Sequence, residues 1–473
     1  MDTENSNKFF GDTICAVSTA YGMGAIAVVR VSGNRSIEMV DKLFRSFRKD
    51  FSLSQVSTHT AHYGQMVSKS GEVIDEVLAT VFRSPKSFTG EDSVEIACHG
   101  SLFIQQEILK SLLAEGCRMA THGEFTQRAF ANGRMDLSQA EAIADLIASQ
   151  SKASHRLAMN QMRGGFSKEL QFLRERLLTF TSLVELELDL SDHEELEFAD
   201  RSELKALAQE IKEKLGKLKN SFSTGNALKN GVPVSIIGET NAGKSTLLNH
   251  LLKEDKAIVS DIHGTTRDVI EDTIILRGIL FRFIDTAGLR RTSDTIESLG
   301  IERSYQMMEK ATLVLWVVDA TQPTQHLSWL ENDLLSHLEG KKVILVFNKC
   351  ELISDEQKSD LLRHYATVKA EKIFISAKEA KNTDQLEEML FRSAQLPEVG
   401  ENDVMVTNMR HYEVLLHAYE SIDRVEEGLQ QGISGDFLSQ DIRECLHYLG
   451  EITGEITTDE VLGNIFSKFC IGK

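Results

Sequence analysis

Nine consecutive residues near the middle of the chain have the types and spacing to hold phosphate groups. The first eight of them, residues 238–245, match the pattern G-x-x-x-x-G-K-[ST] at every position. In this pattern glycines let backbone N–H groups turn toward phosphate oxygens, and the N-terminus of the following helix adds partial positive charge. We therefore predict a nucleotide-binding loop in which Lys244 reaches the β- and γ-phosphates and Ser245 binds Mg²⁺. The alternative is a glycine-rich turn that matches by chance.

The elements that must position this loop are visible as hydrophobic patterns. The apolar run 232–237 before the loop predicts a buried strand, and residues 246–252 after it suit a helix. Three further apolar runs, at 280–284, 343–347 and 373–375, each end at a short polar motif. Because sheets of this type bind ligands at the carboxyl ends of parallel strands, we expect the motifs to converge on one nucleotide.

Two of the motifs are typical of the switch segments of a GTPase. Residues 264–268 resemble switch I, in which Thr266 would complete the Mg²⁺ shell. Residues 285–288 match the D-x-x-G of switch II, where Asp285 would hold Mg²⁺ through water and the Gly288 amide would reach the γ-phosphate. Either motif alone is weak, but their order along the chain predicts GTP as the ligand.

Two further motifs are predicted to read the base. Residues 348–351 resemble N-K-x-D with Glu351 in the last position, and a glutamate carboxylate can still accept the guanine N1 and N2 hydrogens. Residues 376–378 match the S-A-K base-contact loop. Both motifs argue against a phosphate-loop ATPase or kinase, the alternative class. The predicted nucleotide contacts are Asn241, Ala242, Gly243, Lys244, Ser245, Thr246, Ser260, Asp261, Ile262, His263, Gly264, Thr265, Thr266, Asp285, Thr286, Ala287, Gly288, Asn348, Lys349, Glu351, Ser376, Ala377 and Lys378.

Leu289 stands directly after the switch II motif, where many small GTPases have a glutamine that orients the attacking water. A leucine cannot hydrogen-bond a water, so hydrolysis needs another polar group and another source of positive charge. Arg290, Arg291, Asp294 and Glu297 are candidates, and the residues alone do not choose among them. The alternative is that all four are solvated loop charges.

Composition restricts the class of protein. The chain has 473 residues, a net charge of −19 and six cysteines without a C-x-x-C pair, which predicts free thiols in a reducing compartment. No apolar run approaches the ~20 residues that span a bilayer, and the N-terminus lacks a secretion-signal pattern. We expect a cytoplasmic protein, and the acidic net charge argues against indiscriminate binding to nucleic acid.

The patterns predict a multidomain fold with α/β and α-helical parts. Residues 1–132 alternate short strand and helix patterns and suggest an α+β domain, with strands at 26–31 and 77–82 and a helix at 102–113. Helical spacing follows in 133–229 and returns in 397–473. A Ras-like GTPase domain with a mainly parallel sheet, residues 230–396, therefore interrupts a helical domain.

Residues 185–200 are strongly acidic. Paired carboxylates there would suit acid–base chemistry or metal binding, but a solvated helix face and turn is the more ordinary interpretation.

The chain resembles the MnmE (TrmE) family, GTPases of tRNA wobble-uridine modification. The terminal pentapeptide, 469–473, is the most specific match, because no generic GTPase needs it. The matching segments are 27–33, 87–92, 95, 99–100, 123–125, 128–130, 136–143, 241–245, 257–268, 285–290, 451–455 and 469–473.

This resemblance implies an answer to the problem posed by Leu289. Members of the family use K⁺ in place of an arginine finger, and the ion is trapped when two G domains meet across their switch faces. By the family pattern the K⁺ ligands would be the Asn241 side chain, the Ser260 and Ile262 carbonyls, and Thr265. Glu297 would position the attacking water through a second water.

The resemblance also implies a one-carbon donor, 5,10-methylene- or 5-formyl-tetrahydrofolate. Its contacts would be Arg30, Glu95, Arg134 and Lys473, whereas the alternative for Arg30 and Glu95 is an ordinary edge-strand charge. Cys470 matches a cysteine that the family requires for tRNA modification but not for GTP hydrolysis.

The implied partners are a second copy of the chain, tRNA, and MnmG, which uses FAD and NADH and would form a heterotetramer or larger complex. The chain and MnmG together would add an aminomethyl or carboxymethylaminomethyl group at C5 of uridine 34. We expect no membrane among the partners. The alternative is a ribosome-assembly or regulatory GTPase switch, which predicts no folate site and no C-terminal cysteine.

Overall fold

The computed structural model divides the chain into two compact units, each assembled from separated segments. Unit 1 comprises Met1–Ala144, Gln161–Lys214 and Val414–Lys473, and unit 2 comprises Asp145–Asn160 and Leu215–Glu413. The chain thus passes from unit 1 to unit 2 and back twice, because 145–160 and 215–413 both belong to unit 2. The structure describes residues 11–191, 201–239, 241–254, 272–284, 309–322, 338, 340–397, 400 and 403–472.

In its described residues unit 1 contains a seven-stranded sheet of order β3-β4-β5-β6-β2-β1-β7. Neighbouring strands are antiparallel except for the parallel pair β1 and β7. The predicted strands at 26–31 and 77–82 are confirmed. The strands are β1 (Ile14–Val17), β2 (Ile26–Ser32), β3 (Phe44–Ser46), β4 (Thr60–Val67), β5 (Val73–Phe82), β6 (Ser93–His99) and β7 (Arg118–Met119).

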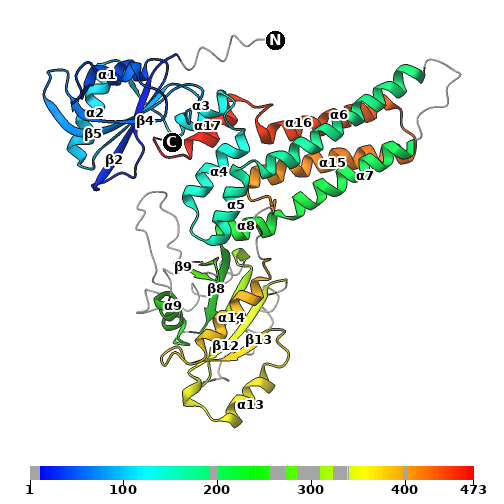
Figure 1. Ribbon diagram of the computed structural model, residues 1–473. Helices are drawn as coiled ribbons and strands as arrows, with labels where there is room; N and C mark the ends of the chain where they lie inside the picture. The colour runs from blue at the N-terminus through cyan, green and yellow to red at the C-terminus, as the bar shows by residue number, and fades with distance from the viewer. Residues whose placement is uncertain are drawn as a thin grey trace. The chain divides into compact units, whose positions relative to one another are not determined.

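Two helices cover one face of this sheet, α1 (Ser36–Leu43) and α2 (Leu102–Ala114), so the helix predicted at 102–113 is confirmed (Figure 1). Alternation along β2 explains the packing, because Val29 and Val31 are buried in the core under the helices and Arg30 lies on the opposite face. The face away from the helices is therefore available for a site.

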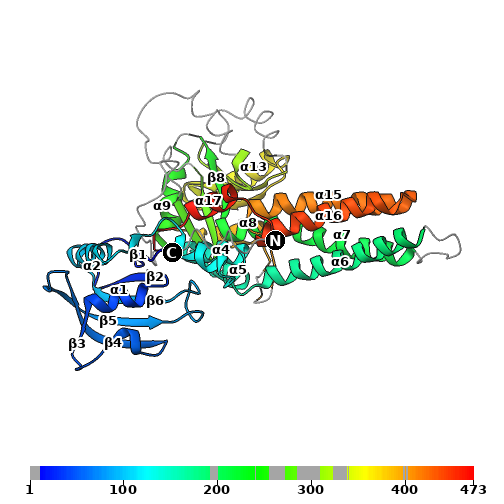
Figure 2. The same ribbon diagram turned by 90° about the horizontal axis from the view of Figure 1, so that it is seen from above.

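Four long helices lie wholly or mainly in unit 1: α6 (Gly165–Ser191), α7 (Arg201–Asn220), α15 (Met409–Gln431) and α16 (Gly435–Thr453). They run side by side in both views (Figures 1 and 2). In α6, apolar residues at three- and four-residue spacing are buried, as the helical period predicts. They are Leu170, Leu173, Leu177, Phe180 and Val184.

Ion pairs connect neighbouring helices of this bundle. Arg176 on α6 pairs with Glu210 on α7 at 2.6 Å, and Lys212 on α7 pairs with Glu426 on α15 at 2.5 Å. Glu185, at the start of the acidic segment 185–200, forms the same kind of ion pair between helices, with Arg443 of α16 at 2.9 Å. Residues 192–200 of that segment lie outside the described residues. Glu185 thus has the structural role expected of a helix-face charge.

Unit 2 contains, in the part that the structure describes, a six-stranded sheet of order β13-β12-β11-β8-β10-β9. All neighbouring pairs are parallel except β9 and β10, which confirms a mainly parallel sheet. The strands are β8 (Val232–Gly238), β9 (Asp272–Leu276), β10 (Ile279–Phe283), β11 (Leu313–Asp319), β12 (Lys342–Asn348) and β13 (Glu371–Phe374).

The strand β11 was not predicted from the sequence, although it lies between β8 and β12 and is almost wholly buried. No nucleotide motif was recognised after it. The other predicted strands and the helix α9 (Lys244–Glu254) are confirmed. The remaining helices are α3 (Glu124–Ala131), α4 (Leu137–Ala148), α5 (Lys152–Met162), η2 (Leu53–Gln55), α8 (Phe222–Asn230), η3 (Cys350–Leu352), α13 (Asp355–His364), α14 (Thr383–Ala394) and α17 (Asp459–Ser467).

Candidate functional site

The phosphate-binding loop joins β8 to α9, as its sequence context predicts. Gly238 has φ +146° and Gly243 has φ +93°, both in the region that favours glycine. A Cβ at Gly238 would lie 2.1 Å from the Val317 carbonyl oxygen, and a Cβ at Gly243 would lie 2.1 Å from Asn348 Nδ2. The two glycines therefore permit a close approach of the loop to β11 and to the base-reading motif.

Lys244 occupies the first turn of α9 and points back over the loop. Its Nζ donates to the carbonyl oxygens of Gly238 and Glu239, each at 2.6 Å. Burial lowers the pKa of Lys244, and the Glu239 carboxylate opposes this effect. A dehydrated ammonium group held only by neutral carbonyls would be stabilised strongly by phosphate oxygens, so the loop fits a nucleotide.

Asn348 links three of the predicted motifs by direct hydrogen bonds. It ends β12, is almost fully buried, and donates from Nδ2 to the Ala242 carbonyl oxygen at 2.8 Å. Its Oδ1 accepts from the backbone N–H of Ala377 at 3.0 Å. One amide therefore holds the phosphate-binding loop and residues 376–378 in fixed positions, which brings together motifs that are more than 100 residues apart in sequence.

The neighbouring side chains leave one carboxylate oxygen available. The Lys349 ammonium group pairs with the Asp319 carboxylate at 2.5 Å. The backbone of Lys349 has a positive φ of 64°. Glu351 lies in η3, and its Oε2 is buried without a hydrogen-bond partner among the described residues. Ser376 is buried and accepts from the Glu379 N–H, and Lys378 is exposed. A carboxylate oxygen without a donor suits the guanine N–H groups assigned to Glu351, and the side chain must turn this buried oxygen toward the base to accept them.

Several predicted residues lie outside the described residues, so the structure does not place them. They comprise both switch segments, the water-positioning candidate and the final lysine. They are Ser260, Asp261, Ile262, His263, Gly264, Thr265, Thr266, Asp285, Thr286, Ala287, Gly288, Glu297 and Lys473, and the Leu289, Arg290, Arg291 and Asp294 named with Glu297 lie there too.

Arg30 and Glu95 face each other across β2 and β6, which are interior strands of the sheet. The interpretation of the two as edge-strand charges is therefore wrong. Arg30 donates from Nε at 3.0 Å and from Nη2 at 2.8 Å, both to Glu95 Oε1. Glu95 Oε2 has no partner among the described residues and remains able to accept from a ligand.

Aromatic rings hold the Arg30 guanidinium in place. Its Cζ lies 5.1 Å from the centre of the Phe88 ring and 5.6 Å from that of Phe125. Phe88 also lines a cavity of about 500 Å³, as does Arg134. Arg30, Glu95 and Arg134 are thus linked through Phe88. The full lining is His59, Phe82, Lys86, Ser87, Phe88 and Arg134.

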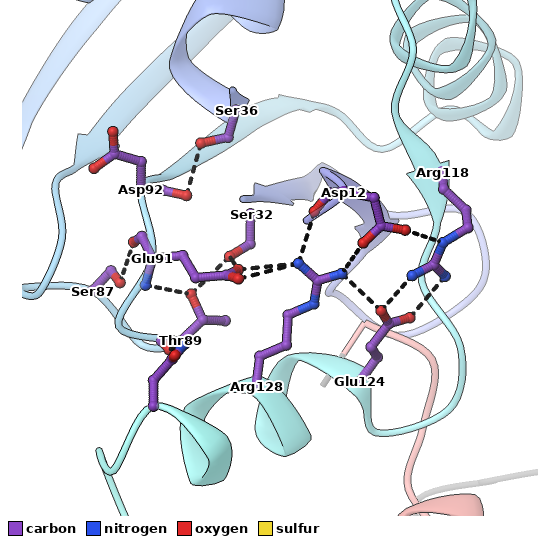
Figure 3. A network of polar contacts seen from close by, with 11 residues as sticks. Asp12, Ser32, Ser36, Ser87, Thr89, Glu91, Asp92, Arg118, Glu124 and Arg128 are labelled. Atoms are coloured by element: carbon purple, nitrogen blue, oxygen red, sulfur yellow. Dashed lines mark hydrogen bonds and ion pairs between the residues drawn. The ribbon is translucent and has the colours of Figure 1, made fainter. Parts of the chain in front are cut away.

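A buried ionic network, which was not predicted, surrounds Arg128 (Figure 3). Arg128 is fully buried and donates to Asp12 Oδ1 at 2.7 Å, to Glu124 Oε1 at 2.9 Å and to Glu91 Oε1 at 3.2 Å. Burial by itself would raise the pKa of Glu124, but hydrogen bonds from Arg118, the Thr121 backbone and Arg128 lower it to about 2.

The network explains the sequence matches at 87–92 and 123–130. Glu91 Oε2 accepts from the Ser32 hydroxyl at 2.8 Å, and Ser87 donates to the Glu91 carbonyl oxygen at 2.5 Å. The loop that presents Phe88 is therefore anchored to a buried arginine. The pattern S-x-T-G-E-D at 87–92 is visible in the sequence. The ion-pair partner of its Glu91 is Arg128 in α3, which lies 37 residues further along the chain.

The last residues of the chain dock on the same sheet. The Ser18 hydroxyl donates to the Gly472 carbonyl oxygen at 3.0 Å, and His122 Nδ1 contacts the Phe469 carbonyl oxygen at 2.9 Å. Phe469 packs with Phe466 in a small core against α4. Cys470 is exposed between these anchors, whereas the other cysteines are buried and all are free thiols.

Among the described residues no group of three or more His, Cys, Asp or Glu side chains is arranged to hold a metal ion. None of the described helices is long and apolar enough to cross a membrane.

Two family models together match most of the chain. The family model described as the MnmE helical domain matches residues 137–470, and the model described as the GTP-binding protein TrmE N-terminus matches residues 13–134. Among solved structures, Era from Aquifex aeolicus, bound to GDP·AlF₄⁻, is 25% identical, with 40% of this chain and 66% of that chain covered and a TM-score of 0.27.

Curated relatives match over nearly their whole length. The tRNA modification GTPase MnmE of Bacteroides fragilis is 59% identical over 465 residues, which are 98% of this chain and 99% of the relative. The protein of the same name from Bacteroides thetaiotaomicron is 58% identical over 465 residues, with the same coverage. With the nucleotide loop, the base-reading motifs and the docked C-terminus in one chain, this similarity shows that the chain belongs to the MnmE family of tRNA modification GTPases.

Proposed function

We propose that this GTPase of tRNA modification hydrolyses GTP in a K⁺-dependent reaction and uses a tetrahydrofolate one-carbon donor. Its partners would be a second copy of the chain and a flavin-dependent MnmG protein, in a heterotetramer or larger complex. The product would be an aminomethyl or carboxymethylaminomethyl group at C5 of uridine 34. GTP hydrolysis would drive a conformational step, separate from the carbon chemistry.

The observation that supports GTP hydrolysis best is the pair of hydrogen bonds made by Asn348. They tie the phosphate-binding loop to the S-A-K loop, so the two ends of a nucleotide meet preformed contacts. Lys244 would exchange its two carbonyl acceptors for phosphate oxygens. Glu351 Oε2, a buried acceptor without a donor, would accept from the guanine base.

Mg²⁺ and K⁺ fit the residues that are described. Ser245 lies in the first turn of α9, where its hydroxyl would bind Mg²⁺ together with Thr266. Asn241 is exposed in the loop with φ +66°, and its carboxamide oxygen is a suitable ligand for K⁺, with Ser260, Ile262 and Thr265 completing the set. Bound K⁺ would supply positive charge beside the phosphates, which Leu289 cannot do.

The Arg30–Glu95 pair fits a folate. Glu95 Oε2 is free to accept from pterin N–H groups, while Oε1 holds Arg30 in place. Arg134 lines the adjoining cavity, and its charge suits a folate carboxylate. These features distinguish the proposal from a ribosome-assembly GTPase, because that alternative predicts no folate site. Fluorescence titration of the full chain with 5-formyl-tetrahydrofolate tests it, and absence of binding would favour the alternative.

The K⁺ requirement is tested by GTPase rates in buffers that contain only K⁺ or only Na⁺, at several protein concentrations. We expect turnover that depends on K⁺ and rises with protein concentration, because the ion site would be completed by two G domains. Equal rates in both salts, independent of concentration, would overturn the mechanism. Glu297→Ala should keep GTP affinity and lose most of the hydrolysis, and near-normal turnover would assign the water to another group.

The role of Cys470 is tested separately. Cys470→Ser should leave GTP hydrolysis intact and abolish the wobble-uridine modification, as judged by mass analysis of tRNA from cells that carry only this variant. Co-elution of the chain with MnmG from the same organism tests the partner. Normal modification in the Cys470→Ser strain would remove the thiol from the proposed chemistry.

A further inference from the structure

The cavity beside the Arg30–Glu95 pair has a lining that no nucleotide motif accounts for. It measures about 500 Å³, within the usual size of ligand pockets, and contains two aromatic rings and two cationic side chains. Phe82 and Phe88 supply the rings, and Lys86 and Arg134 supply the cations. His59 packs its ring edge-on against Phe82 with centres 5.4 Å apart. Among the described residues, no carboxylate lines this cavity.

The two cations lack ion-pair partners. Neither Lys86 nor Arg134 forms an ion pair or a side-chain hydrogen bond within the described part of the chain, whereas Arg30, Arg118 and Arg128 on the same module are all paired with carboxylates. This occurs in a chain whose net charge is −19. Two unpaired cations at one cavity repel each other, and a ligand with more than one negative charge relieves that repulsion.

Hydrogen bonds anchor the loop that forms one wall of the cavity. The Ser84 N–H donates to Asp92 Oδ1 at 2.8 Å, and Asn132 Nδ2 donates to the Thr89 carbonyl oxygen at 2.7 Å. Gly90 allows a close approach, since a Cβ there would lie 3.2 Å from Arg134 Cγ. The loop is also anchored through Glu91 to the buried arginine network (Figure 3). These contacts anchor the backbone near Lys86 and Arg134, whose side chains are exposed.

Phe88 connects the cavity to the proposed pterin contacts. Its ring contacts the Arg30 guanidinium and also forms part of the cavity lining. A ligand that begins at Glu95 and passes Phe88 meets Lys86 and Arg134 next. Folate has this order of groups: a pterin, an aromatic aminobenzoyl group, and then glutamate carboxylates. Each additional γ-linked glutamate adds one negative charge.

We propose that this cavity binds the glutamate tail of the folate donor, with Lys86 as a contact for its carboxylates, and that the chain prefers polyglutamylated folates. The inference depends on the proposed folate donor and adds a selectivity to it. Arg134 takes part in both sites, since it was already expected to contact the folate. Lys86 belongs to the tail subsite alone, which makes it the residue to test.

The experiment is a calorimetric titration of the full chain with the monoglutamate and the triglutamate of 5-formyl-tetrahydrofolate at low and moderate salt. We expect the triglutamate to bind about tenfold more tightly at low salt, and less so as salt rises. Lys86→Gln should remove most of this preference and change monoglutamate affinity less. Lys69→Gln is the matched control, because Lys69 is exposed in the turn between β4 and β5 and does not line the cavity.

The outcomes separate this inference from the proposed function. Binding of both folates with equal affinity would overturn the tail subsite and leave the folate donor in place, as would a preference that Lys86→Gln does not reduce. Failure of both folates to bind would overturn the two together. If Lys86→Gln weakened tRNA binding and left both folate affinities unchanged, the cavity would be a nucleic-acid contact and the tail subsite would be wrong.

Discussion

At the scale of single residues, two buried polar side chains determine how the sites are built. Asn348 joins two nucleotide motifs through one amide, using both its donor and its acceptor. The Arg128 guanidinium likewise connects separate groups, because it forms ion pairs with the carboxylates of Asp12, Glu91 and Glu124. The partners of Asn348 and two of the three carboxylates around Arg128 are far apart in sequence, whereas Glu124 lies four residues from Arg128 on α3. Removal of either central group leaves several others buried and unsatisfied.

Asn348→Asp tests the amide because it keeps the acceptor for the Ala377 N–H and loses the donor to the Ala242 carbonyl oxygen. We expect GDP affinity to fall by at least about tenfold, because a carboxylate facing a carbonyl oxygen would displace the phosphate-binding loop. Fluorescent GDP titration measures this. Arg363→Gln on the exposed face of α13 is the control, and affinity like that of the control would contradict the bridging role.

Glu124 predicts an acid-sensitive step in the stability of unit 1. Its pKa is lowered from 4.5 to about 2, so it stabilises the fold fully above pH 4.5, and this contribution is lost as the pH falls through about 2. The full effect corresponds to about 3 kcal/mol. Chemical unfolding of Glu124→Gln should therefore be less pH-dependent between pH 5 and 2.

The matched control for this measurement is Glu107→Gln, whose carboxylate pairs with Lys110 on the surface of α2. An exposed pair of this kind contributes less than about 1 kcal/mol. If the free energy of unfolding fell in parallel for the wild type and Glu124→Gln on acidification, the ionised network would not be what stabilises unit 1.

At the scale of elements, the C-terminal segment 469–472 docks on unit 1 and leaves Cys470 exposed. It is held by a two-residue bridge between His122 and Ile471 and by the Ser18–Gly472 hydrogen bond. Gly472 has φ +95°, and a Cβ there would lie 2.2 Å from the Val17 carbonyl oxygen. The glycine is therefore required for docking, independently of any role in chemistry.

Gly472→Ala should release this segment while GTP hydrolysis continues, because the nucleotide contacts lie in unit 2. Hydrogen exchange of the terminal peptide should rise several-fold, and tRNA modification should fall with it. Gly463→Ala is the control, since a Cβ at that position in α17 meets nothing within 4 Å. Unchanged exchange in Gly472→Ala would show that the close approach to Val17 is tolerated.

At the scale of the whole molecule, the two units have separate hydrophobic cores. One core gathers β8, β10, β11 and β12 in unit 2, including Leu315, and the other lies under the sheet of unit 1 around Ile96. Each core is large enough to unfold as its own cooperative transition. The nucleotide contacts that the structure describes belong to unit 2 alone.

Calorimetry of the full chain should therefore show two transitions, and GDP with Mg²⁺ should raise only one of them, by mass action. Leu315→Ala should lower that same transition, and Ile96→Ala should lower the other, each at a cost of about 2–5 kcal/mol. A single transition that moves as one with nucleotide and with both substitutions would contradict independent units.

The sequence alone predicted a GTPase, because the phosphate-binding motif and its partners are contiguous patterns with fixed spacing. Each strand predicted within 230–396 bears its motif at its end. The sequence also determined the order of the α+β, helical and α/β parts. It did not predict β11, since no recognised motif marks that strand.

Only the tertiary structure decided the roles of the charged residues in the N-terminal α+β domain. Arg128 and Glu91 are 37 residues apart, and Arg30 and Glu95 are 65 apart, so neither pair has a periodicity that sequence reasoning can detect. The same holds for Lys86 and Arg134, which become neighbours only through the shared cavity. Local patterns report local structure, whereas a buried charge takes its role from partners that folding brings to it.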